Sequence, residues 1–329
     1  MPRIKDGKFV VVGGASLLGS HIGEQLLEGG AREIVLLDNL ALGSTDNIDH
    51  LLADFRCTFV RGDVLKLHEL HDPLAGADGV FAVAGFLAAP IMANPWMGID
   101  VNVRGVQNVM EACRYQNVRK VVFSSSVGVY GAVGEEPNSE VSPLRWSGMQ
   151  PGVIIYCASK VIGEGIGRLY QQQHGIDFLG LRYSAIYGER LHKRALDATR
   201  MVEAYEAVRA GRAPVIDGDG SGVQDYVYVG DVARANLLGM ESPAKGTGIN
   251  IVSGVDTSQR EIVEQIIVAA KSDLKPEFRV DPARLALPVS HKQGFSREAA
   301  RELLGWEPRV SIAEGIERVV AWFDLQHRP

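Results

Sequence analysis

The chain has 329 residues, 46% of them apolar and 22% charged, which is enough apolar sequence for a large core and for one or two domains. Its formal net charge of -6, without a long run of lysine and arginine, argues against a nucleic-acid-binding surface. No stretch approaches the roughly 20 apolar residues that a membrane span requires. Neither nucleic acid nor a membrane is therefore an expected partner.

Three cysteines, Cys57, Cys113 and Cys157, lack Cys-x-x-Cys spacing. They indicate neither a disulfide framework nor a zinc site, and no other metal site is expected. A reducing cytoplasm is the expected location.

Short apolar runs rich in valine and isoleucine alternate with helical periodicities in the first part of the chain. The runs predict strands at 8–12, 34–38, 58–61, 79–84, 120–125 and 177–182. The periodicities predict helices near 17–29, 66–75, 97–115 and 156–174. This alternation is typical of the α/β class, with a doubly wound parallel (Rossmann) sheet whose ligands bind at the carboxyl ends of the strands.

The pattern changes near residue 183, where loop-rich sequence begins, and DYVYVGDVARANLLGM then resembles one more strand and helix of the first domain. We expect residues 1–182 plus about 224–253 to form the dinucleotide-binding Rossmann domain. Residues about 183–223 plus 254–329 are expected to form a smaller, discontinuous α/β substrate domain.

The first predicted strand leads through a glycine-containing turn into a helix, in KFVVVGGASLLGSHIGEQLLEGG. A dinucleotide-binding turn has the spacing Gly-x-x-Gly-x-x-Gly, and this chain has Gly13, Ser16 and Gly19 at these positions. Gly13 permits the tight turn, and Gly19 lets the helix approach the sheet. Ser16 is expected to cap the helix and to offer its hydroxyl to a phosphate. A plain structural turn is the alternative.

Asp38 ends the second apolar run, EIVLLD, where an acid accepts hydrogen bonds from the adenosine ribose and repels a ribose phosphate. Asn39 follows, where an NADP enzyme would be expected to carry a basic residue, so NAD is the favoured cofactor. An ordinary strand-ending aspartate is the alternative.

Tyr156 and Lys160 of YCASK are four residues apart and project from one face of a predicted helix. The Lys160 ammonium is expected to lower the pKa of Tyr156 from its reference of about 10, so that the phenol acts as a general acid and base. Ser124, Ser125 and Ser126 end the fifth predicted strand, at the ligand-binding edge of the sheet. A chance Tyr-x-x-x-Lys and a solvated serine loop are the alternatives.

Together these segments resemble an extended short-chain dehydrogenase/reductase of the NAD-dependent nucleotide-sugar epimerase and dehydratase branch. The matching segments, which span nearly the whole chain, are the glycine turn, LLDNL, RGDV, FAVAG, VNVRGVQNVMEAC, FSSSVGVYG, YCASK, LRYSAIYG, DGDGSGVQDYVYVGDVA and LLGWEP. The resemblance implies that Ser126, Tyr156 and Lys160 form the catalytic set and that NAD is the cofactor.

The resemblance also implies a cofactor site. Asp63 and Val64 are expected near the adenine, and Ser124 and Tyr183 near the nicotinamide. The full expected set is Gly13, Ser16, Leu17, Leu18, Gly19, Asp38, Asn39, Ser44, Asp63, Val64, Val83, Ala84, Gly85, Asn102, Ser124, Tyr156, Lys160 and Tyr183.

The substrate site departs from the family pattern. Ala185 stands where these enzymes usually have asparagine, and Gln224 where they usually have arginine, so two contacts to a nucleotide diphosphate are missing. The expected substrate-binding residues are Ala185, Lys193, Gln224 and Arg284, with Arg284 at about the spacing of a phosphate-binding arginine.

Two further departures concern the chemistry. Val127 and Gly128 replace the Asp-Glu pair of the dehydratases, so elimination is not expected. The approach to Tyr156 is longer than usual and is expected to bring Trp146, Ile154 and other apolar side chains near the site.

The expected reaction is epimerisation of a nucleotide sugar by transient hydride transfer, through a keto intermediate that turns over before the hydride returns. An NAD-dependent dehydrogenase or reductase of a non-nucleotide alcohol or ketone is the alternative. A non-catalytic NAD-sensing regulator is disfavoured by the intact catalytic set. The helices near 97–115 and 156–174 resemble those that pair in the family's four-helix interface, so a homodimer is expected.

Overall fold

Seven parallel strands form the main sheet of the computed structural model, which describes residues 1–131, 137–191, 196–279, 292 and 294–326. Their order is β10-β6-β5-β4-β1-β2-β3. The strands are β1 (Lys8–Val12), β2 (Glu33–Asp38), β3 (Cys57–Arg61), β4 (Gly79–Ala82), β5 (Lys120–Ser126), β6 (Asp177–Tyr183) and β10 (Thr247–Ile251). The predicted Rossmann sheet is confirmed, and the strand order reverses between β1 and β4.

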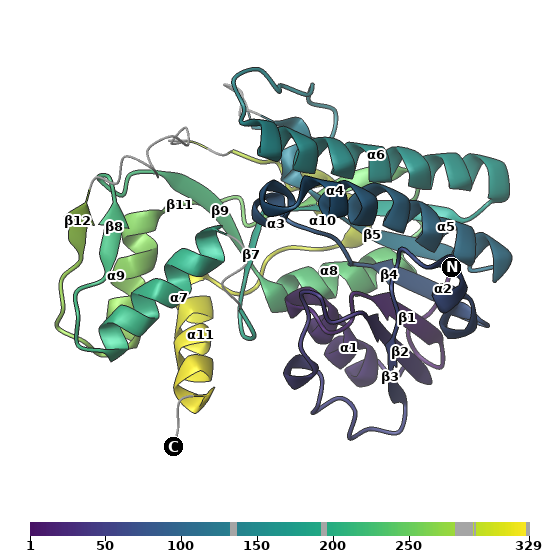
Figure 1. The fold of residues 1–329 in the computed structure, drawn as a ribbon, viewed down its shortest axis with the longest axis horizontal. Coiled ribbons are helices and arrows are strands. Elements are labelled where there is room, and N and C mark those ends of the chain that lie inside the picture. Colours follow the sequence, from purple (N-terminus) through teal and green to yellow (C-terminus); the bar gives the residue numbers. More distant parts are fainter. Residues whose placement is uncertain (132–136, 192–195, 280–291, 293, 327–329) are drawn as a thin grey trace.

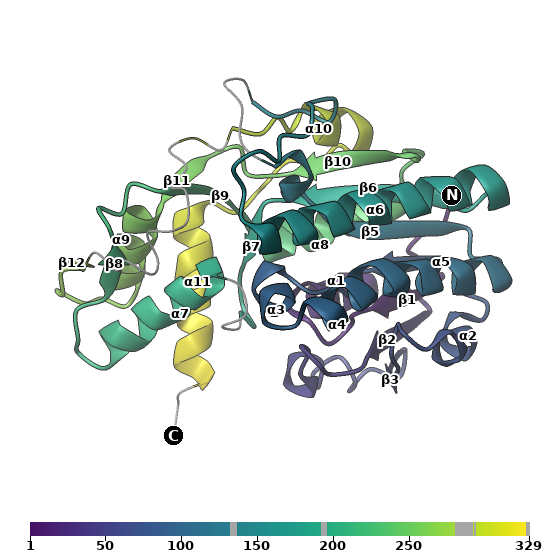
Figure 2. The ribbon, with the colours of Figure 1, turned by 45° about the horizontal axis from the view of Figure 1, so that its top comes forward.

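Helices cover both faces of this sheet (Figures 1 and 2). One face carries α1 (Leu17–Glu28) and α8 (Val229–Glu241), which pack against each other. The other carries α2 (Leu67–Leu74), α5 (Val106–Tyr115) and α6 (Pro151–His174). Side chains alternate across a strand, so Phe9 and Val11 join the core on the α1 side while Val10 and Val12 join the core on the α5 side. Burial on both faces explains why the strands are continuously apolar.

The helix predicted near 97–115 is confirmed, with a π-helical turn within it and a further short helix before it. The chain forms α3 (Ala88–Ala93), α4 (Pro95–Ile99), a π-helical turn η2 (Asp100–Gly105) and then α5. Asn94 ends α3 and caps α4, because its Oδ1 accepts a hydrogen bond from Met97 N at 3.2 Å. Short 3-10 turns, η1 (Thr45–Asn47) and η3 (Val127–Tyr130), follow β2 and β5.

The helix predicted near 156–174 begins earlier than expected, at Pro151, in the first-turn position that proline favours. Ile154 and Ile155 therefore lie in the first turns of α6 rather than in a loop. Its end at Gly175, with φ of +72°, is a left-handed glycine cap.

The remaining elements form the left-hand part of Figure 1 and the last helices of the chain. They are β7 (Ala185–Tyr187), α7 (Leu196–Arg209), β8 (Val215–Asp217), β9 (Val223–Tyr228), β11 (Asp256–Ser258), α9 (Gln259–Ala269), β12 (Glu277–Arg279), α10 (Glu298–Leu304) and α11 (Ile312–Gln326). They include a β11-β9-β7 sheet and a β12-β8 pair. The segment after residue 183, which the sequence predicts to be rich in loops, thus contains β7 and α7.

One expected strand lies in a different sheet. The strand expected to follow residue 224 within the first domain is β9, but it pairs with β7 and β11 and not with the main sheet. The seventh strand of the main sheet is β10, because Thr247–Ile251 pairs with β6. Sequence pattern alone does not identify a pairing partner. Within the described residues, none of the helices has the length and apolar character needed to cross a membrane.

Candidate functional site

The turn between β1 and α1 brings three backbone segments into close contact. Gly13 has a φ of +90°, and a Cβ there would lie 2.7 Å from the backbone nitrogen of Ala84, just after β4. A Cβ on Gly19 would lie 2.1 Å from the carbonyl oxygen of Gly13. Only glycine permits these approaches, so both residues have the roles predicted for them.

Ser16 is the N-cap of α1. Its Oγ accepts a hydrogen bond from Gly19 N at 3.1 Å and donates one to the Gly13 carbonyl at 2.7 Å. The predicted capping role is confirmed. The serine therefore stabilises the turn that lacks the middle glycine, whereas its contact with a phosphate remains a prediction.

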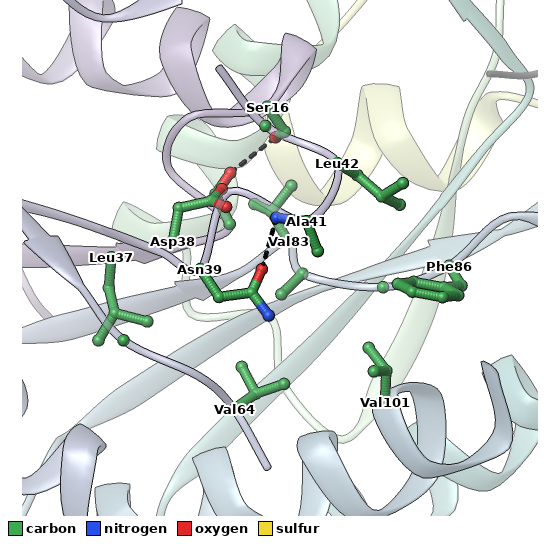
Figure 3. A pocket seen from close by; sticks show the side chains of 15 residues that line it. Ser16, Leu37, Asp38, Asn39, Ala41, Leu42, Val64, Val83, Phe86 and Val101 are labelled. Atoms are coloured by element: carbon green, nitrogen blue, oxygen red, sulfur yellow. Dashed lines mark hydrogen bonds between the residues drawn. The ribbon is translucent and has the colours of Figure 1, made fainter. Parts of the chain in front are cut away.

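A pocket opens beside this turn, at the carboxyl ends of β1, β2 and β4 (Figure 3). Its lining contains many of the predicted cofactor residues, namely Gly13, Ser16, Asp38, Asn39, Val64, Val83, Ala84 and Gly85. It also contains residues that sequence reasoning missed, namely Leu37, Ala41, Leu42, Gly43, Gly62, Phe86 and Val101. The missed residues are sequence neighbours of predicted ones. Leu37, Gly62, Phe86 and Val101 are each adjacent to a predicted residue, and the other three lie between Asn39 and Ser44.

Asp38 lies at the end of β2 inside this pocket and is 8% exposed. Its Oδ2 accepts a hydrogen bond from Ala15 N at 3.1 Å, and its Oδ1 accepts one from Leu40 N at 2.8 Å. The next side chain, Asn39, accepts a hydrogen bond from Ala41 N at 2.9 Å, as Figure 3 shows. The turn after β1 and the turn after β2 thus fix the carboxylate at the end of β2, whereas its contact with a ribose remains a prediction.

The pocket has the chemical features that one end of a dinucleotide requires. Gly13 and Ser16 line it at the N-terminus of α1, Asp38 supplies an acceptor, and Val64 and Val83 supply apolar walls. A Cβ on Gly85 would lie 3.3 Å from Lys160 Nζ and 3.4 Å from Asn102 Oδ1. Gly85 therefore keeps space between the pocket and the predicted catalytic lysine.

Some predicted cofactor residues lie beside the pocket rather than in its lining. Ser44 caps η1, where its Oγ accepts a hydrogen bond from Asp46 N at 3.3 Å. Asp63 accepts a hydrogen bond from Leu65 N at 2.9 Å, and Leu18 is buried in the core with Leu17 packed against it. Their cofactor contacts remain predictions.

Ser126, Tyr156 and Lys160 come together where β5 ends beneath the first turns of α6. Ser126 is the last residue of β5, and its Oγ accepts a hydrogen bond from Gly128 N at 3.0 Å. The Tyr156 ring lies close by, since a Cβ on Gly128 would be 3.2 Å from Ser126 Oγ and 3.7 Å from Tyr156 Cε1. Lys160 Nζ donates to the Ser124 carbonyl at 2.9 Å and lies 5.8 Å from the centre of the Tyr156 ring. The geometry suits proton transfer at a substrate oxygen held between Ser126 and Tyr156.

Burial has the largest effect on the pKa values of Tyr156 and Lys160. It raises the pKa of Tyr156 to about 12, although the interaction with Ser126 acts in the opposite direction. It lowers the pKa of Lys160 to about 8. The expected net lowering of the Tyr156 pKa is therefore wrong for this arrangement. The reason is that Nζ of Lys160 is directed at the Ser124 carbonyl, while desolvation penalises the phenolate.

Asn102 and Ser159 connect the pocket to the helix that carries Tyr156. Asn102, in the π-helical turn, accepts a hydrogen bond from Phe86 N at 2.7 Å and donates to Phe86 O at 2.9 Å and to Ser159 Oγ at 3.0 Å. Ser159 donates to the carbonyl of Tyr156 at 2.7 Å. Asn102 thereby links the end of the pocket to α6, and a π-helical turn at a functional site is a recurrent device.

Ser124 and Tyr183 are buried neighbours on β5 and β6. Ser124 Oγ lies 3.4 Å from the Tyr183 hydroxyl, which donates to Asn236 Oδ1 of α8 at 3.0 Å. Burial raises the pKa of Tyr183 to about 12. Their contact with the nicotinamide remains a prediction.

The predicted substrate residues are only partly described. Ala185 of β7 pairs with Tyr226 of β9, and Gln224 of β9 pairs with Thr257 of β11, so both lie on the small sheet. Lys193 and Arg284 lie outside the described residues. Among the residues that the structure describes, no cluster of three histidine, cysteine or acidic side chains is arranged to hold a metal ion.

Comparison with known proteins gives consistent matches over the whole chain. The family described as "NAD dependent epimerase/dehydratase family" matches residues 9–252. A UDP-glucose 4-epimerase of Mycolicibacterium smegmatis is 33% identical, over 96% of this chain and 98% of its own length. A putative UDP-glucose 4-epimerase of Methanocaldococcus jannaschii is 32% identical, over 97% of this chain and 99% of its own.

Solved structures that resemble this chain are consistent with the sequence matches. A UDP-N-acetylglucosamine 4-epimerase from Methanobrevibacter ruminantium, in complex with UDP-N-acetylmuramic acid, superposes with a TM-score of 0.86 at 26% identity, over 98% of this chain and 99% of that chain. Thermus thermophilus UDP-glucose 4-epimerase in complex with NAD superposes with a TM-score of 0.80 at 30% identity, over 96% and 99%. With its Rossmann sheet, glycine turn and strand-end aspartate, this chain belongs to the NAD-dependent epimerase/dehydratase family.

Proposed function

We propose that the protein epimerises a nucleotide sugar with NAD, using Ser126, Tyr156 and Lys160. The observation that carries the proposal is the clustering of Ser126 and Tyr156 at the end of β5, where a Cβ on Gly128 would lie 3.2 Å from Ser126 Oγ and 3.7 Å from Tyr156 Cε1. Lys160 donates to the neighbouring Ser124 carbonyl, and the glycine-bounded pocket lies next to this cluster. The relatives named as UDP-glucose and UDP-N-acetylglucosamine 4-epimerases support a sugar linked to UDP.

In this mechanism, the pocket around Gly13 and Asp38 would hold NAD, which would supply the hydride acceptor and donor for the sugar carbon. Tyr156 removes the proton from the hydroxyl on that carbon, and Ser126 donates a hydrogen bond to the same oxygen. Lys160, in its charged form, stabilises the phenolate. After the keto sugar turns over, Tyr156 returns the proton to the oxygen, so the product differs from the substrate only in configuration.

Elimination chemistry has no support in the residues next to Ser126. Val127 and Gly128 occupy η3, so neither position supplies an acid to remove or donate a second proton. Epimerisation needs only the one proton carrier that Tyr156 provides.

The proposed substrate lobe consists of residues about 183–223 and 254–329. Gln224 supplies a neutral amide where the family usually has a guanidinium, so Arg284 and Lys193 are proposed to supply the cationic contacts to the diphosphate. Buried phosphates without paired donors are strongly disfavoured, so this charge is needed.

We also propose that the protein is a homodimer in the cytoplasm. Trp96 and Ile99 of α4 are 79% and 45% exposed, and Ile162 and Leu169 of α6 are 45% and 47% exposed. These residues belong to α4 and α6, which contact each other, and α6 also packs against α5. An apolar patch of this kind is typical of an interface. The three buried free cysteines fit a reducing compartment.

The test is calorimetric titration of UDP, dTDP, GDP and CDP into the NAD-loaded protein, followed by turnover of the corresponding sugars. We expect micromolar binding of one nucleotide, lost in Arg284→Ala and retained in Arg212→Ala, which changes an exposed arginine of the same lobe. Interconversion of two sugar epimers without net NADH would support the proposal. No nucleotide binding, together with net reduction of NAD by a simple alcohol, would favour the dehydrogenase alternative instead.

A further inference from the structure

A row of buried polar side chains runs under α6 and has no role in the proposed proton transfer. In the parallel register, Ser125 of β5 lies beside Arg182 of β6, which lies beside Asn250 of β10. Their exposures are 3%, 8% and 0%. Buried polar groups are costly unless they are hydrogen-bonded, so the row needs a partner from the helix that covers it.

Glu164 of α6 is that partner. Its Oε1 accepts hydrogen bonds from Ser125 Oγ at 2.7 Å and from Arg182 Nε at 2.8 Å, and its Oε2 accepts one from Arg182 Nη2 at 2.8 Å. Burial alone would raise the pKa of Glu164, but the bonds from Arg182 hold it below its usual value. The carboxylate is therefore ionised at neutral pH, and the two-pronged pairing with a planar guanidinium restricts its position.

The strand side of this contact is anchored as well. Arg182 Nη1 donates to the Tyr130 hydroxyl at 2.8 Å, and Tyr130 donates to Asn250 Oδ1 at 2.7 Å. Tyr130 belongs to η3, which follows Ser126 directly. The guanidinium thus has fixed partners on both sides.

The contact joins the two elements that carry the reacting groups. Tyr156, Lys160 and Glu164 follow one another at intervals of four along α6 and so share one face of the helix. On β5, Ser125 lies between Ser124, whose carbonyl accepts from Lys160, and Ser126, whose Oγ lies near the Tyr156 ring. Any shift of α6 along the sheet must stretch both sets of bonds.

We infer that Glu164, held by Ser125 and Arg182, is a positioning residue that sets the depth and rotation of α6 against β5 and so keeps Tyr156 and Lys160 in register with Ser126. This inference rests on the proposed function. A buried ion pair is a weak stabiliser compared with apolar residues of similar volume, so its contribution here is orientation rather than stability.

The experiment compares four variants of the full-length protein: Glu164→Gln, Ser125→Ala, the double variant Glu164→Met/Arg182→Met, and Arg168→Ala. Arg168 is the matched control, since it donates to the same Glu164 Oε2 at 3.0 Å from a side chain that is 44% exposed. We expect Glu164→Gln to lower kcat by roughly 10- to 100-fold with KM changed less than about 3-fold, as misplacement of reacting groups does. Arg168→Ala should change neither by more than about 2-fold.

The double variant separates orientation from stability. It should regain the thermal midpoint of the parent, because apolar side chains replace the pair, yet retain the low kcat. Recovery of kcat together with stability would overturn the inference.

A second readout does not depend on the substrate. With 13C-labelled tyrosine, the Tyr156 resonance, identified by its loss in Tyr156→Phe, should shift and titrate differently in Glu164→Gln but not in Arg168→Ala. If this shift occurs and no sugar is turned over, the proposed reaction fails while the positioning role stands. If turnover occurs and neither kcat nor the resonance responds to Glu164→Gln, the positioning role fails alone.

Discussion

At the scale of single residues, burial favours the neutral forms of both titrating groups in the candidate site. The pKa of Tyr156 is raised to about 12 and that of Lys160 is lowered to about 8 by desolvation. Burial thus disfavours the phenolate form of Tyr156 and the ammonium form of Lys160. Ser126 acts against burial, because its interaction with Tyr156 lowers the pKa of the phenol. Without a bound cofactor, burial therefore keeps the proton on Tyr156 at neutral pH, while a lysine with a pKa of about 8 is still mostly charged there. The positive charge of Lys160 is what the proposed mechanism requires to stabilise the phenolate.

Tyr156→Phe should reduce turnover by roughly 10²- to 10⁴-fold, because it deletes the proton carrier while leaving the pocket around Asp38 untouched. NAD affinity, measured by calorimetry, should stay within about 3-fold of the parent. Tyr170→Phe is the matched control, since Tyr170 lies on the same helix and its hydroxyl donates to Glu111 instead. Near-parental rates in Tyr156→Phe would refute the assigned role.

Lys160→Met should change how stability depends on pH. The unfolded chain binds the lysine proton up to about its ordinary pKa of 10.5, whereas the folded chain releases it near 8. Between these values the unfolded state holds more protons, so the free energy of unfolding rises with pH, by up to about 3 kcal/mol from this group. Below pH 8 the buried charge lowers stability in full.

Denaturant unfolding without added NAD, from pH 7 to pH 10, measures this effect. The parent should gain stability with pH relative to Lys160→Met. Lys120→Met should lose a similar gain in stability, since burial also lowers the pKa of Lys120 to about 8. It should keep turnover, because Lys120 Nζ donates to Ser242 O and Ala244 O rather than to the Ser124 carbonyl. An unchanged pH dependence in Lys160→Met would contradict the desolvation of this lysine.

At the scale of elements, the position of α1 depends on two glycines and one serine. Ser16 caps the helix, and Gly13 and Gly19 let it begin directly against the turn after β1. The amides that a pyrophosphate needs are presented only if this close packing is kept.

Gly19→Ala should destabilise the protein by about 1–3 kcal/mol and weaken NAD binding, because its Cβ would lie 2.1 Å from the carbonyl oxygen of Gly13. Thermal unfolding and NAD titration measure the two effects. Glu28→Ala, an exposed change at the end of the same helix, should leave both nearly unaltered. Equal thermal stability and equal NAD affinity of the two variants would show that α1 accommodates the added Cβ at no cost, and would contradict the prediction.

At the scale of the whole molecule, the exposed apolar side chains of α4 and α6 are the strongest indication of assembly. Light scattering at micromolar concentration should give the mass of a dimer. The double variant Trp96→Asp/Ile162→Asp should shift it toward the monomer, because two charges would be buried in an apolar contact. Phe55→Asp, at a side chain that is 95% exposed beside β3, should leave the mass unchanged. A monomeric parent would refute the proposed interface.

Much of the fold follows from short-range pattern. Parallel strands that are buried on both faces are continuously apolar. The segments around 8–12, 34–38 and 120–125 have this pattern, so the sequence predicts them as strands of a parallel sheet. The glycine turn and Ser16 cap depend on neighbours within a few residues, so these local features were predictable. The pairing of β9 was not, because a half-buried strand such as VQDYVY fits either sheet.

By itself, the sequence determined the Rossmann class, the glycine turn, the end of β2 at Asp38 and the spacing that puts Tyr156 and Lys160 on one helical face. These features depend on periodicity and on residue type. Only the tertiary structure decided the direction of the Tyr156 pKa and the partner of Glu164. Desolvation and ion pairs arise from side chains distant in the chain, as in the contact between Glu164 and Ser125 across 39 positions.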